Sequence, residues 1–576
     1  MTAEIIKTPE PRKREFLPIN FNITGWNVLE PFFEELKGRE INSPLDLEKW
    51  MADRDEMEAF LSENLAWRYI KMNIETTDKK LCGDYEFFMT EIQPKTMPYG
   101  NFYDEKLISS PFLKNLDSEK YRIYLRSVKK RMEIFREKNV SLLTKIETDA
   151  QKYRAISSRQ MVEINGEEVT MQKAASFLKN TNRDFREEVF VKLTERRMKD
   201  ADELNNLFTH LLNMRNQAAL NAGFKNYRDY MFASLGRFDY SVADCENFHS
   251  SIQKEIVPII GKFNSARKEK LKLNKLKPWD LDVDVTGKAP LKPFLNAEEL
   301  TQKTIECFEN VDPYFAGCVE IMKQMNRLDL DSKKGKAPGG FQYPLYESVA
   351  PFIFMNAVGT LRDVVTLVHE GGHAIHSFLE QHHELVDFKS TPSEVAELAS
   401  MSMELISMEH WETFFKVPEE LKRAKREQLE KILTLLPWIA IVDKFQHWVY
   451  ENPEHSLEAR AAKWREISDS FSSGVVDWSG FEESKKTSWH AQLHIFEVPF
   501  YYIEYGMAQL GAIAVWRNYK LNPRKALEQY KAALSLGYTK SIGEIYETAG
   551  IKFDFSKEYV KELADFVRGE LDKIEA

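Results

Sequence analysis

Residues 360–376 read TLRDVVTLVHEGGHAIH and carry the most informative pattern in this chain. His369 and His373 are four residues apart, so on a helix they share one face, and both rings can reach a single tetrahedral metal ion. In that geometry Glu370 cannot add a third ligand from the same helix. It lies instead where it can take a proton from a water bound to the metal.

The residues around this motif predict how its helix is built. The apolar run 351–358 predicts a buried or edge strand. Thr360 and Asp363 have the spacing of a capping box, which predicts that a helix begins there. Gly371 and Gly372 lie in the helix interior, where each costs about 1 kcal/mol relative to alanine. Either a close approach of backbone or substrate, or a crowded helix crossing, would explain this pair.

A third metal ligand is expected from a second helix. Thr391-Pro392-Ser393-Glu394 has the form of a capping box with proline at the first helical position. Because Glu394 is explained as the cap, Glu397, one turn later, is the predicted ligand of a two-histidine, one-glutamate zinc site. Glu404 follows on the same face. It either orients a ligand histidine through its second ring nitrogen or is a solvated surface carboxylate.

Other histidines in the second half of the chain could compete for a metal ion. His490 and His494 are also four residues apart, but no glutamate follows either of them directly. His376 shares a helix face with the motif, and we interpret it as a packing residue or as a partner of a ligand. His382 and His383, near the end of that helix, are expected at the surface.

The tract 494–505, HIFEVPFYYIEY, combines a histidine with several phenols. Pro499 is expected to open a helix on which Tyr502 and Tyr505 share a face. Together with His494, these hydroxyls could donate hydrogen bonds to an oxyanion that develops beside a metal ion. Packing in a core or an interface is the alternative explanation of such a cluster.

The rest of the chain predicts amphipathic helices. Apolar stripes at helical spacing run through residues 119–160 and 181–214, which is typical of helix–helix packing. Between them, residues 161–170 alternate and turn at Asn165-Gly166, a hairpin signal. We interpret this hairpin as the boundary between an N-terminal helical lobe, residues 1–160, and the remaining region, residues 161–576.

Composition limits the classes of function. The 576 residues include 43% hydrophobic and 30% charged residues, which excludes a collagen-like or largely disordered chain. The net charge of -10 disfavours nucleic acid and anionic membranes as partners. Four cysteines are too few for a disulfide framework, and the first residues lack an apolar signal sequence. We therefore expect a cytoplasmic protein, and a monomer.

Taken together, these motifs resemble the M3 zinc metallopeptidases, most closely the oligoendopeptidase F and Pz-peptidase branch. The resemblance covers roughly residues 160–550, and residues 1–160 share only its helical character. Its matching segments occur in the family's order: 333–341, 351–358, 366–376, 394–404 and 494–505.

The resemblance implies one zinc ion per chain and a set of catalytic residues around it. The implied zinc ligands are His369, His373 and Glu397. Glu370 would be the general base that activates a zinc-bound water. His494 and Tyr502 or Tyr505 match positions that stabilise the tetrahedral intermediate and contact the substrate.

The same resemblance implies a mainly α, two-lobed helical zincin fold, with a deep substrate channel and a small sheet beside the HExxH helix. Residues 161–576 would be the M3 catalytic region, and the glycine-rich loop 335–341 would lie over the substrate. The implied function is zinc-dependent hydrolysis of internal bonds in short oligopeptides, with the substrate pairing to an edge strand at 352–358. A C-terminal exopeptidase and a peptide-binding scaffold without catalysis are the alternatives.

Overall fold

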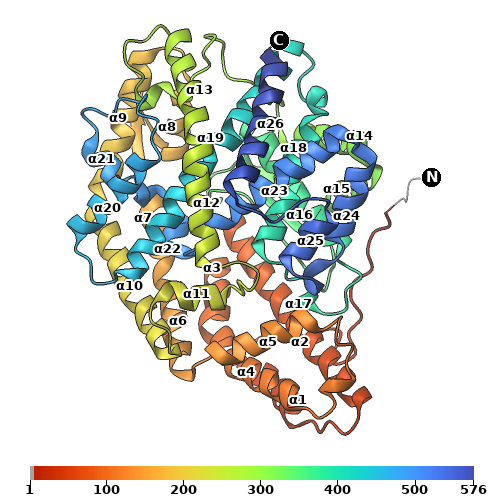
Figure 1. The fold of residues 1–576 in the computed structure, drawn as a ribbon. Coiled ribbons are helices and arrows are strands. Elements are labelled where there is room, and N and C mark those ends of the chain that lie inside the picture. The colour runs from red at the N-terminus through yellow and green to blue at the C-terminus, as the bar shows by residue number, and fades with distance from the viewer. Residues whose placement is uncertain (1–5, 576) are drawn as a thin grey trace. The chain divides into compact units, whose positions relative to one another are not determined.

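The computed structural model describes residues 6–575, and helices make up most of them (Figure 1). The strands are short, and within the described residues they form one two-stranded and one three-stranded sheet. The mainly α-helical fold predicted from the sequence is therefore confirmed. In the same residues, no helix is both long enough and apolar enough to cross a lipid bilayer.

Contacts within the chain define two compact units, each built from three separate segments. Unit 1 comprises Met1–Val140, Lys292–Lys425 and Ala508–Phe553, and unit 2 comprises Ser141–Leu291, Arg426–Met507 and Asp554–Ala576. The HExxH helix belongs to unit 1, whereas the tract from His494 to Tyr505 belongs to unit 2. The division into residues 1–160 and 161–576 stays a prediction.

In the described residues, unit 1 contains the three-stranded sheet and twelve α-helices of its own, ten of them before its C-terminal segment. They are α1 (Trp26–Gly38), α2 (Pro44–Ile74), α3 (Lys79–Phe87), α4 (Gln93–Ser109), α5 (Arg122–Ile134), α14 (Ala297–Val311), α15 (Pro313–Gln324), α16 (Leu361–Leu379), α17 (Val386–Lys389), α18 (Ser393–Met408), with β3 (Leu328–Asp331), β4 (Phe341–Tyr343) and β5 (Phe352–Ala357). Two further helices near its C-terminal segment are α24 (Pro523–Leu534) and α25 (Ile542–Thr548).

Unit 2 holds the two-stranded sheet and a second set of helices. They are α7 (Lys152–Ser158), β1 (Met161–Ile164), β2 (Glu167–Thr170), α8 (Met171–Ser176), α9 (Arg183–Lys199), α10 (Ala201–Ala222), α11 (Tyr227–Ser234), α12 (Val242–Glu255), α13 (Val257–Lys270), α20 (Leu457–Ser470), α21 (Glu482–Lys486), α22 (Leu493–Glu497) and α26 (Lys557–Glu575). Three helices cross the limits between the units: α6 (Glu137–Ala150), α19 (Pro418–Glu451) and α23 (Tyr502–Leu521).

The three-stranded sheet has the order β3-β5-β4, so β5 is its central strand. β5 pairs in parallel with β3 and antiparallel with β4, with Phe354 opposite Phe341. The alternative that residues 351–358 form an edge strand is therefore wrong, and so is the expectation that a substrate pairs with them. The apolar run is explained by burial, because Phe352 and Phe354 pack against Ala66 and Ile70 of α2.

The glycine-rich loop before β4 is anchored to this sheet. The buried Lys336 ammonium donates to Asp329 Oδ1 at 2.6 Å and to the carbonyl oxygens of Asp331 and Met355. The Asn356 amide donates to the carbonyl oxygens of Ala337 and Gly339. These bonds hold the loop against β3 and β5, although its glycines and lysines alone suggest only a turn.

The glycine pair in α16 is explained by helix packing. A Cβ atom on Gly372 would lie 2.6 Å from Ser400 Cα and 2.8 Å from the Ala399 carbonyl oxygen of α18. A Cβ atom on Gly371 would lie 2.8 Å from the Phe308 ring. The structure therefore supports a close approach of backbone at a crowded helix crossing, so the packing of α16 accounts for the pair.

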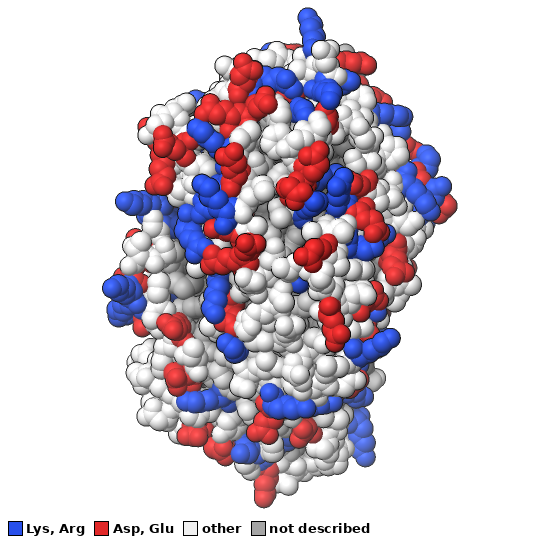
Figure 2. Space-filling model, turned by 90° about the vertical axis from the view of Figure 1, so that its left-hand side faces the viewer, with Lys and Arg blue, Asp and Glu red and all other residues white. Residues whose placement is uncertain are grey.

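The other elements predicted from sequence patterns are present with different limits. The hairpin is confirmed as β1 and β2, and Asn165 adopts φ 54° at its turn. The stretch 119–160 is divided into α5, α6 and α7, and 181–214 into α9 and α10, which meet at Asp200. On the face shown in Figure 2, basic and acidic side chains are interspersed rather than gathered by sign.

The substitution Gly372→Ala tests the close approach of α16 and α18. A methyl group there contacts backbone atoms that cannot rotate away, so we expect a loss of about 1–3 kcal/mol in the free energy of unfolding. Denaturant unfolding of the full-length protein measures this loss. Gly83→Ala is the control, because a Cβ atom in the exposed helix α3 meets nothing within 4 Å, and alanine should stabilise it slightly. Equal effects of the two substitutions would contradict the packing explanation.

Candidate metal centre and active-site residues

The capping box predicted at the start of α16 is present. The Asp363 carboxylate accepts the backbone N–H of Thr360 at 2.8 Å, and the Thr360 side chain caps the helix in return. Because the helix begins there, His369 and His373 lie one turn apart on the same face. Their ring centroids are 5.0 Å apart and their planes are almost perpendicular, so both imidazoles can point at one ion.

Glu397 reaches this pair from α18, as the sequence predicted. Its Oε2 lies 3.3 Å from His369 Nε2 and 3.6 Å from His373 Nε2. One donor atom from each residue lies within 4.8 Å of the others, and the glutamate is buried. Two imidazoles and one carboxylate are a ligand set suited to catalytic zinc, with one position left for water or substrate.

Electrostatics in this group also fit a bound cation. Burial alone would raise the pKa of Glu397, but His373 and His369 hold that pKa well below its ordinary value. Burial would lower the pKa of His369, yet Glu397 and Glu404 raise it well above the usual range. The carboxylates of Glu397 and Glu404 therefore place negative charge beside the two rings, and this charge attracts protons. A divalent ion bound there would replace those protons.

Glu404 is the outer partner of a histidine rather than a solvated surface residue. Its Oε1 lies 2.7 Å from His369 Nδ1, and only 9% of the residue is exposed. When the Nδ1–H group donates to this carboxylate, Nε2 is left as the ligand atom that faces Glu397. Of the two interpretations open at the sequence level, the geometry supports the orienting role.

The capping box predicted at Glu394 is wrong. α18 begins at Ser393, so Pro392 occupies the N-cap position and no side chain caps the helix. The helix therefore begins one residue later than expected, and proline, which carries no side-chain acceptor, cannot cap it. Glu394 is buried, and its carbonyl oxygen accepts the Tyr546 hydroxyl. A capping role therefore does not distinguish Glu394 from Glu397, but Glu397 does lie beside the histidines.

Glu370 lies on α16 between the two histidines and is only 6% exposed. Burial raises its pKa, an effect that His369 and His373 oppose only in part. The backbone N–H of Gln342 in β4 also interacts with this carboxyl group. The raised pKa suits a group that must accept and then release a proton.

The predicted histidine–tyrosine cluster forms within unit 2. The His494 ring centroid lies 4.8 Å from that of Tyr502 and 5.7 Å from that of Tyr505. Tyr501, which the sequence analysis did not select, lies almost parallel to the His494 ring at 5.9 Å. In the sequence, the one indication that Tyr501 belongs to this cluster is that it directly precedes Tyr502.

A turn at Phe500 creates this cluster, and the predicted start of the helix at Pro499 is wrong. α23 begins at Tyr502, and Phe500 has φ 70°, a conformation unfavourable for a bulky residue. The Phe500 N–H donates to Gln446 Oε1 at 2.9 Å, and its carbonyl oxygen accepts from the Arg237 guanidinium. Arg237 also donates to Glu504 at 2.8 Å. These buried groups hold the unusual turn in place.

A short hydrogen-bond chain orients His494. The Trp438 indole N–H donates to Gln492 Oε1 at 2.8 Å, and Gln492 Nε2 lies 2.7 Å from His494 Nδ1. An indole can only donate, so the Gln492 oxygen must face it and the Gln492 amine must face the histidine. Nδ1 is therefore the acceptor, and the neutral ring carries its proton on Nε2.

Within the described residues, the remaining histidines do not belong to the possible metal-binding group of His369, His373 and Glu397. His376 is buried near Glu380, and burial lowers its pKa to about 3, which fits a packing role. His382 is exposed as predicted, whereas His383 is only partly exposed, and its Nε2–H donates to the Ser535 carbonyl oxygen. Within the described residues, His490 and His494 belong to neither of the two possible metal-binding groups.

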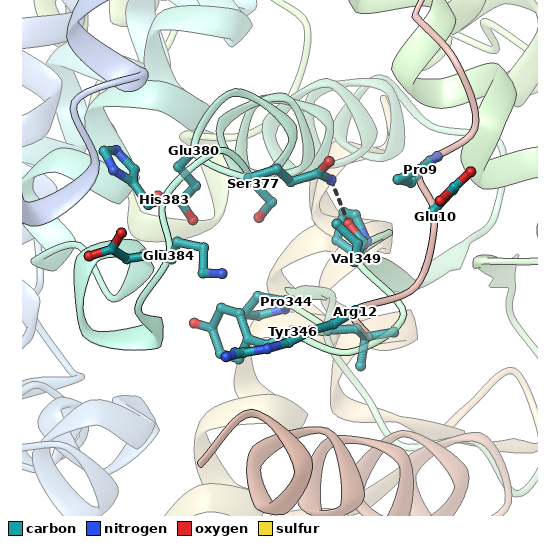
Figure 3. A pocket seen from close by; sticks show the side chains of 14 residues that line it. Pro9, Glu10, Arg12, Pro344, Tyr346, Val349, Ser377, Glu380, His383 and Glu384 are labelled. Carbon is teal, nitrogen blue, oxygen red and sulfur yellow. Dashed lines mark hydrogen bonds between the residues drawn. The ribbon is translucent and has the colours of Figure 1, made fainter. Parts of the chain in front are cut away.

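A cavity of about 440 Å³ lies at the C-terminal end of α16 (Figure 3). Its lining includes Glu380, His383 and Lys389, but none of the residues of the HExxH group. The Gln381 amide closes one side by donating to the Val349 carbonyl at 2.6 Å. Burial raises the pKa of the Glu380 carboxyl in the cavity wall well above its usual value.

The substitution Glu404→Ala tests how His369 is oriented. Without its carboxylate partner the ring is free to rotate, and we expect the affinity for Zn²⁺ to fall about 10–100-fold. Competition with a chromogenic chelator measures this affinity. Glu412→Ala, at an exposed carboxylate of the same unit, should leave it unchanged. An unaltered affinity in Glu404→Ala would restore the interpretation of a solvated surface carboxylate.

Comparison with known proteins agrees with this geometry. The family model for peptidase family M3 matches residues 176–565, and the model for the peptidase M3 N-terminal domain matches residues 16–135. An oligoendopeptidase F homolog of Borreliella burgdorferi is 23% identical over an alignment of 557 residues, and the alignment covers 93% of this chain and 88% of that protein.

Solved structures share the fold over nearly the whole chain. A structure of Pz peptidase A with an inhibitor is 26% identical, with a TM-score of 0.91 over 97% of this chain and 99% of that one. An oligoendopeptidase F from Enterococcus faecium, 18% identical over 95% of this chain and 96% of its own, has the same fold at a TM-score of 0.65. The chain belongs to peptidase family M3 and is a metalloendopeptidase of the oligoendopeptidase F branch.

Proposed function

We propose that this protein is a zinc-dependent endopeptidase that hydrolyses internal peptide bonds of short oligopeptides. The observation that carries the proposal is a buried Glu370 on the same helix as two histidines that meet Glu397. His369, His373 and Glu397 would hold one Zn²⁺ per chain. When bound, the ion supplies a Lewis acid that polarises the scissile carbonyl and makes water acidic at neutral pH.

Glu370 is the proposed general base. Its raised pKa, caused first by burial, favours acceptance of a proton from the attacking water. The same carboxyl group then delivers this proton to the departing amine. Within the described residues, Glu397 is the one carboxylate in the possible metal-binding group with His369 and His373. Glu397 is therefore the proposed ligand, and Glu370 remains available as the base.

His494, Tyr502 and Tyr505 are proposed to stabilise the oxyanion of the tetrahedral intermediate. The chain from Trp438 through Gln492 supports this role for the histidine, because it fixes the proton of the neutral ring on Nε2. The ring is then a donor without first being protonated. A well-placed donor to an oxyanion contributes about 3 kcal/mol to transition-state stabilisation.

The outer edge of β4 is the proposed site for the substrate backbone. The strand order leaves β4 at an edge of its sheet, and Gln342 in β4 interacts with Glu370 through its backbone. An extended peptide that added a strand there would run beside the general base. The glycine-rich loop that precedes β4 would then cover the substrate. The cytoplasmic location and the monomeric state remain predictions.

Glu370→Gln tests the general base. The amide keeps the size of the side chain but cannot accept a proton, so we expect kcat to fall about 100- to 10,000-fold while the zinc content stays equal to that of the wild type. The assay uses an internally quenched peptide of about ten residues, blocked at both ends. Mass spectrometry of the products distinguishes internal cleavage from release of C-terminal dipeptides, which needs a free carboxylate. Full activity in the zinc-loaded variant would exclude this role.

Gln492→Glu tests the protonation of His494. A carboxylate at this position accepts a proton from Nδ1, so the neutral ring would lose its Nε2–H donor. We expect kcat at neutral pH to fall to about the level of His494→Ala, a loss of roughly 100- to 1,000-fold.

The pH dependence separates this explanation from a general loss of structure. The new carboxylate raises the pKa of His494, and below that pKa both ring nitrogens carry protons. The activity of Gln492→Glu should therefore recover as pH falls, whereas that of His494→Ala should not. Zinc content is measured at each pH as the control. Parallel pH profiles for the two variants would contradict the proposed tautomer.

A further inference from the structure

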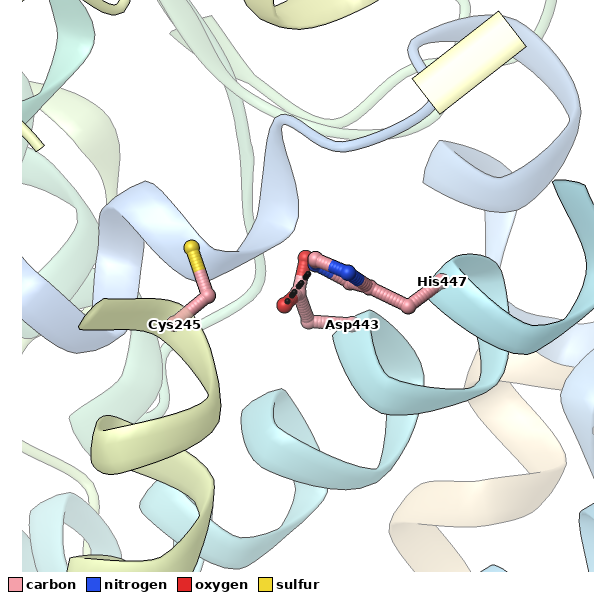
Figure 4. A group of neighbouring side chains, drawn as sticks. All are labelled: Cys245, Asp443 and His447. Atoms are coloured by element: carbon pink, nitrogen blue, oxygen red, sulfur yellow. Dashed lines mark ion pairs between the residues drawn. The ribbon is translucent and has the colours of Figure 1, made fainter. Parts of the chain in front are cut away.

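A second group of side chains that could bind a metal ion lies in unit 2, on α12 and α19, and none of these side chains takes part in the proposed reaction. Cys245 and His249 are four residues apart on α12, and Asp443 and His447 are four residues apart on α19. Each pair therefore projects from one helix face. Figure 4 shows Cys245, Asp443 and His447 converging from these two helices.

The donor atoms of this group are close together and buried. One atom each from Cys245, Asp443 and His447 lies within 4.8 Å of the other two. His447 Nε2 is 3.1 Å from Asp443 Oδ2, and His249 Nε2 is 2.8 Å from the same oxygen. Cys245 and Asp443 are fully inaccessible to solvent, and the two histidines are at most 6% exposed.

The arrangement has the same features as the HExxH group in unit 1. There the carboxylate lies 3.3 and 3.6 Å from two imidazole nitrogens, and the rings are nearly perpendicular at 5.0 Å. Here His249 and His447 are also nearly perpendicular, at 5.8 Å. His249 donates to the Asp443 carboxylate, which is how outer residues commonly hold a ligand in place.

Hydrogen bonds within the protein do not satisfy all of these polar atoms. Asp443 Oδ1 and both ring nitrogens of His447 are buried and have no hydrogen-bond partner. His447 Nε2 lies 3.1 Å from Asp443 Oδ2, but the two groups are not aligned as in a hydrogen bond. Two ligands of one metal ion would lie beside each other in this way. Buried polar groups without partners are rare and call for a bound species that satisfies them.

We propose that Cys245, Asp443 and His447 bind a second divalent transition-metal ion, Zn²⁺ in the native protein, with His249 orienting Asp443. The ligand types favour zinc over calcium or magnesium, which prefer oxygen ligands. A thiolate and a carboxylate also balance the two positive charges, so the loaded site is neutral and can be fully buried. This inference does not depend on the proposed peptidase mechanism.

Such an ion would join α12 to α19 inside unit 2. α19 also carries Gln446, whose side chain holds the unusual turn at Phe500. The His447 ring packs against Phe500, with ring centroids 5.5 Å apart. An ion at this site would therefore stabilise the part of α19 that packs against Phe500, the residue at the turn that forms the His494 cluster.

Cobalt substitution of the full-length protein tests the site. Protein produced in cobalt-supplemented medium should contain two metal ions per chain by elemental analysis. It should also show a thiolate-to-cobalt charge-transfer band in the near ultraviolet. The group of His369, His373 and Glu397 contains no sulfur, so it cannot produce that band. One ion per chain, or two ions without the band, would overturn the proposal.

Two cysteine variants assign the band. The chain has four cysteines, so a triple serine variant at Cys82, Cys307 and Cys318 retains only Cys245 and should keep both the band and the second ion. Cys245→Ser should lose both. A band that persists in Cys245→Ser, or that disappears in the folded triple variant, would overturn the assignment. If Cys245→Ser does not fold, the wild type and the triple variant decide the question.

Discussion

The close crossing of α16 and α18 is the constraint on which the metal centre depends. Gly372 allows the two backbones to touch, because any side chain there would overlap with Ser400 and Ala399. At this separation Glu397 can meet both histidines, and Glu404, two turns later, can meet the outer nitrogen of His369. A wider crossing would move both carboxylates out of reach at once. The conformational cost of a glycine within the helix is therefore offset by the chemistry that it permits.

Buried charge is arranged in both units so that each group has a defined protonation state. In unit 1, Glu397 stays ionised beside two imidazoles, whereas burial raises the pKa of Glu370. Two carboxylates near the same helix thus become suited to different tasks through their surroundings. In unit 2, an indole that can only donate determines, through Gln492, which nitrogen of His494 carries the proton. Buried hydrogen-bond partners therefore control the chemistry of these side chains.

The errors of the sequence analysis have a common physical origin. An apolar run such as 351–358 reports burial, but a central strand and a covered edge strand are equally apolar. Pro499 resembles a helix start, yet the backbone turns at Phe500 because two side chains distant in sequence bind that residue: Gln446 of α19 and Arg237 of the loop after α11. Thr391 and Glu394 have the spacing of a capping box, but the helix begins at Ser393, where Pro392 occupies the N-cap position and offers no side-chain acceptor. Each error concerns a choice that contacts far along the chain decide.

Local periodicity was sufficient to predict the mainly helical fold, the start of α16 and the shared face of His369 and His373, since these follow from residues within a few turns. The resemblance of five motifs to family M3 was sufficient to predict the family. Tertiary structure alone decided that β4 is the edge strand, that Glu404 binds His369, that Phe500 forms the turn, and that Cys245 meets Asp443. Glu404 and His369 are 35 residues apart and Phe500 and Arg237 are 263 residues apart, and no local pattern encodes which distant partner a side chain will meet.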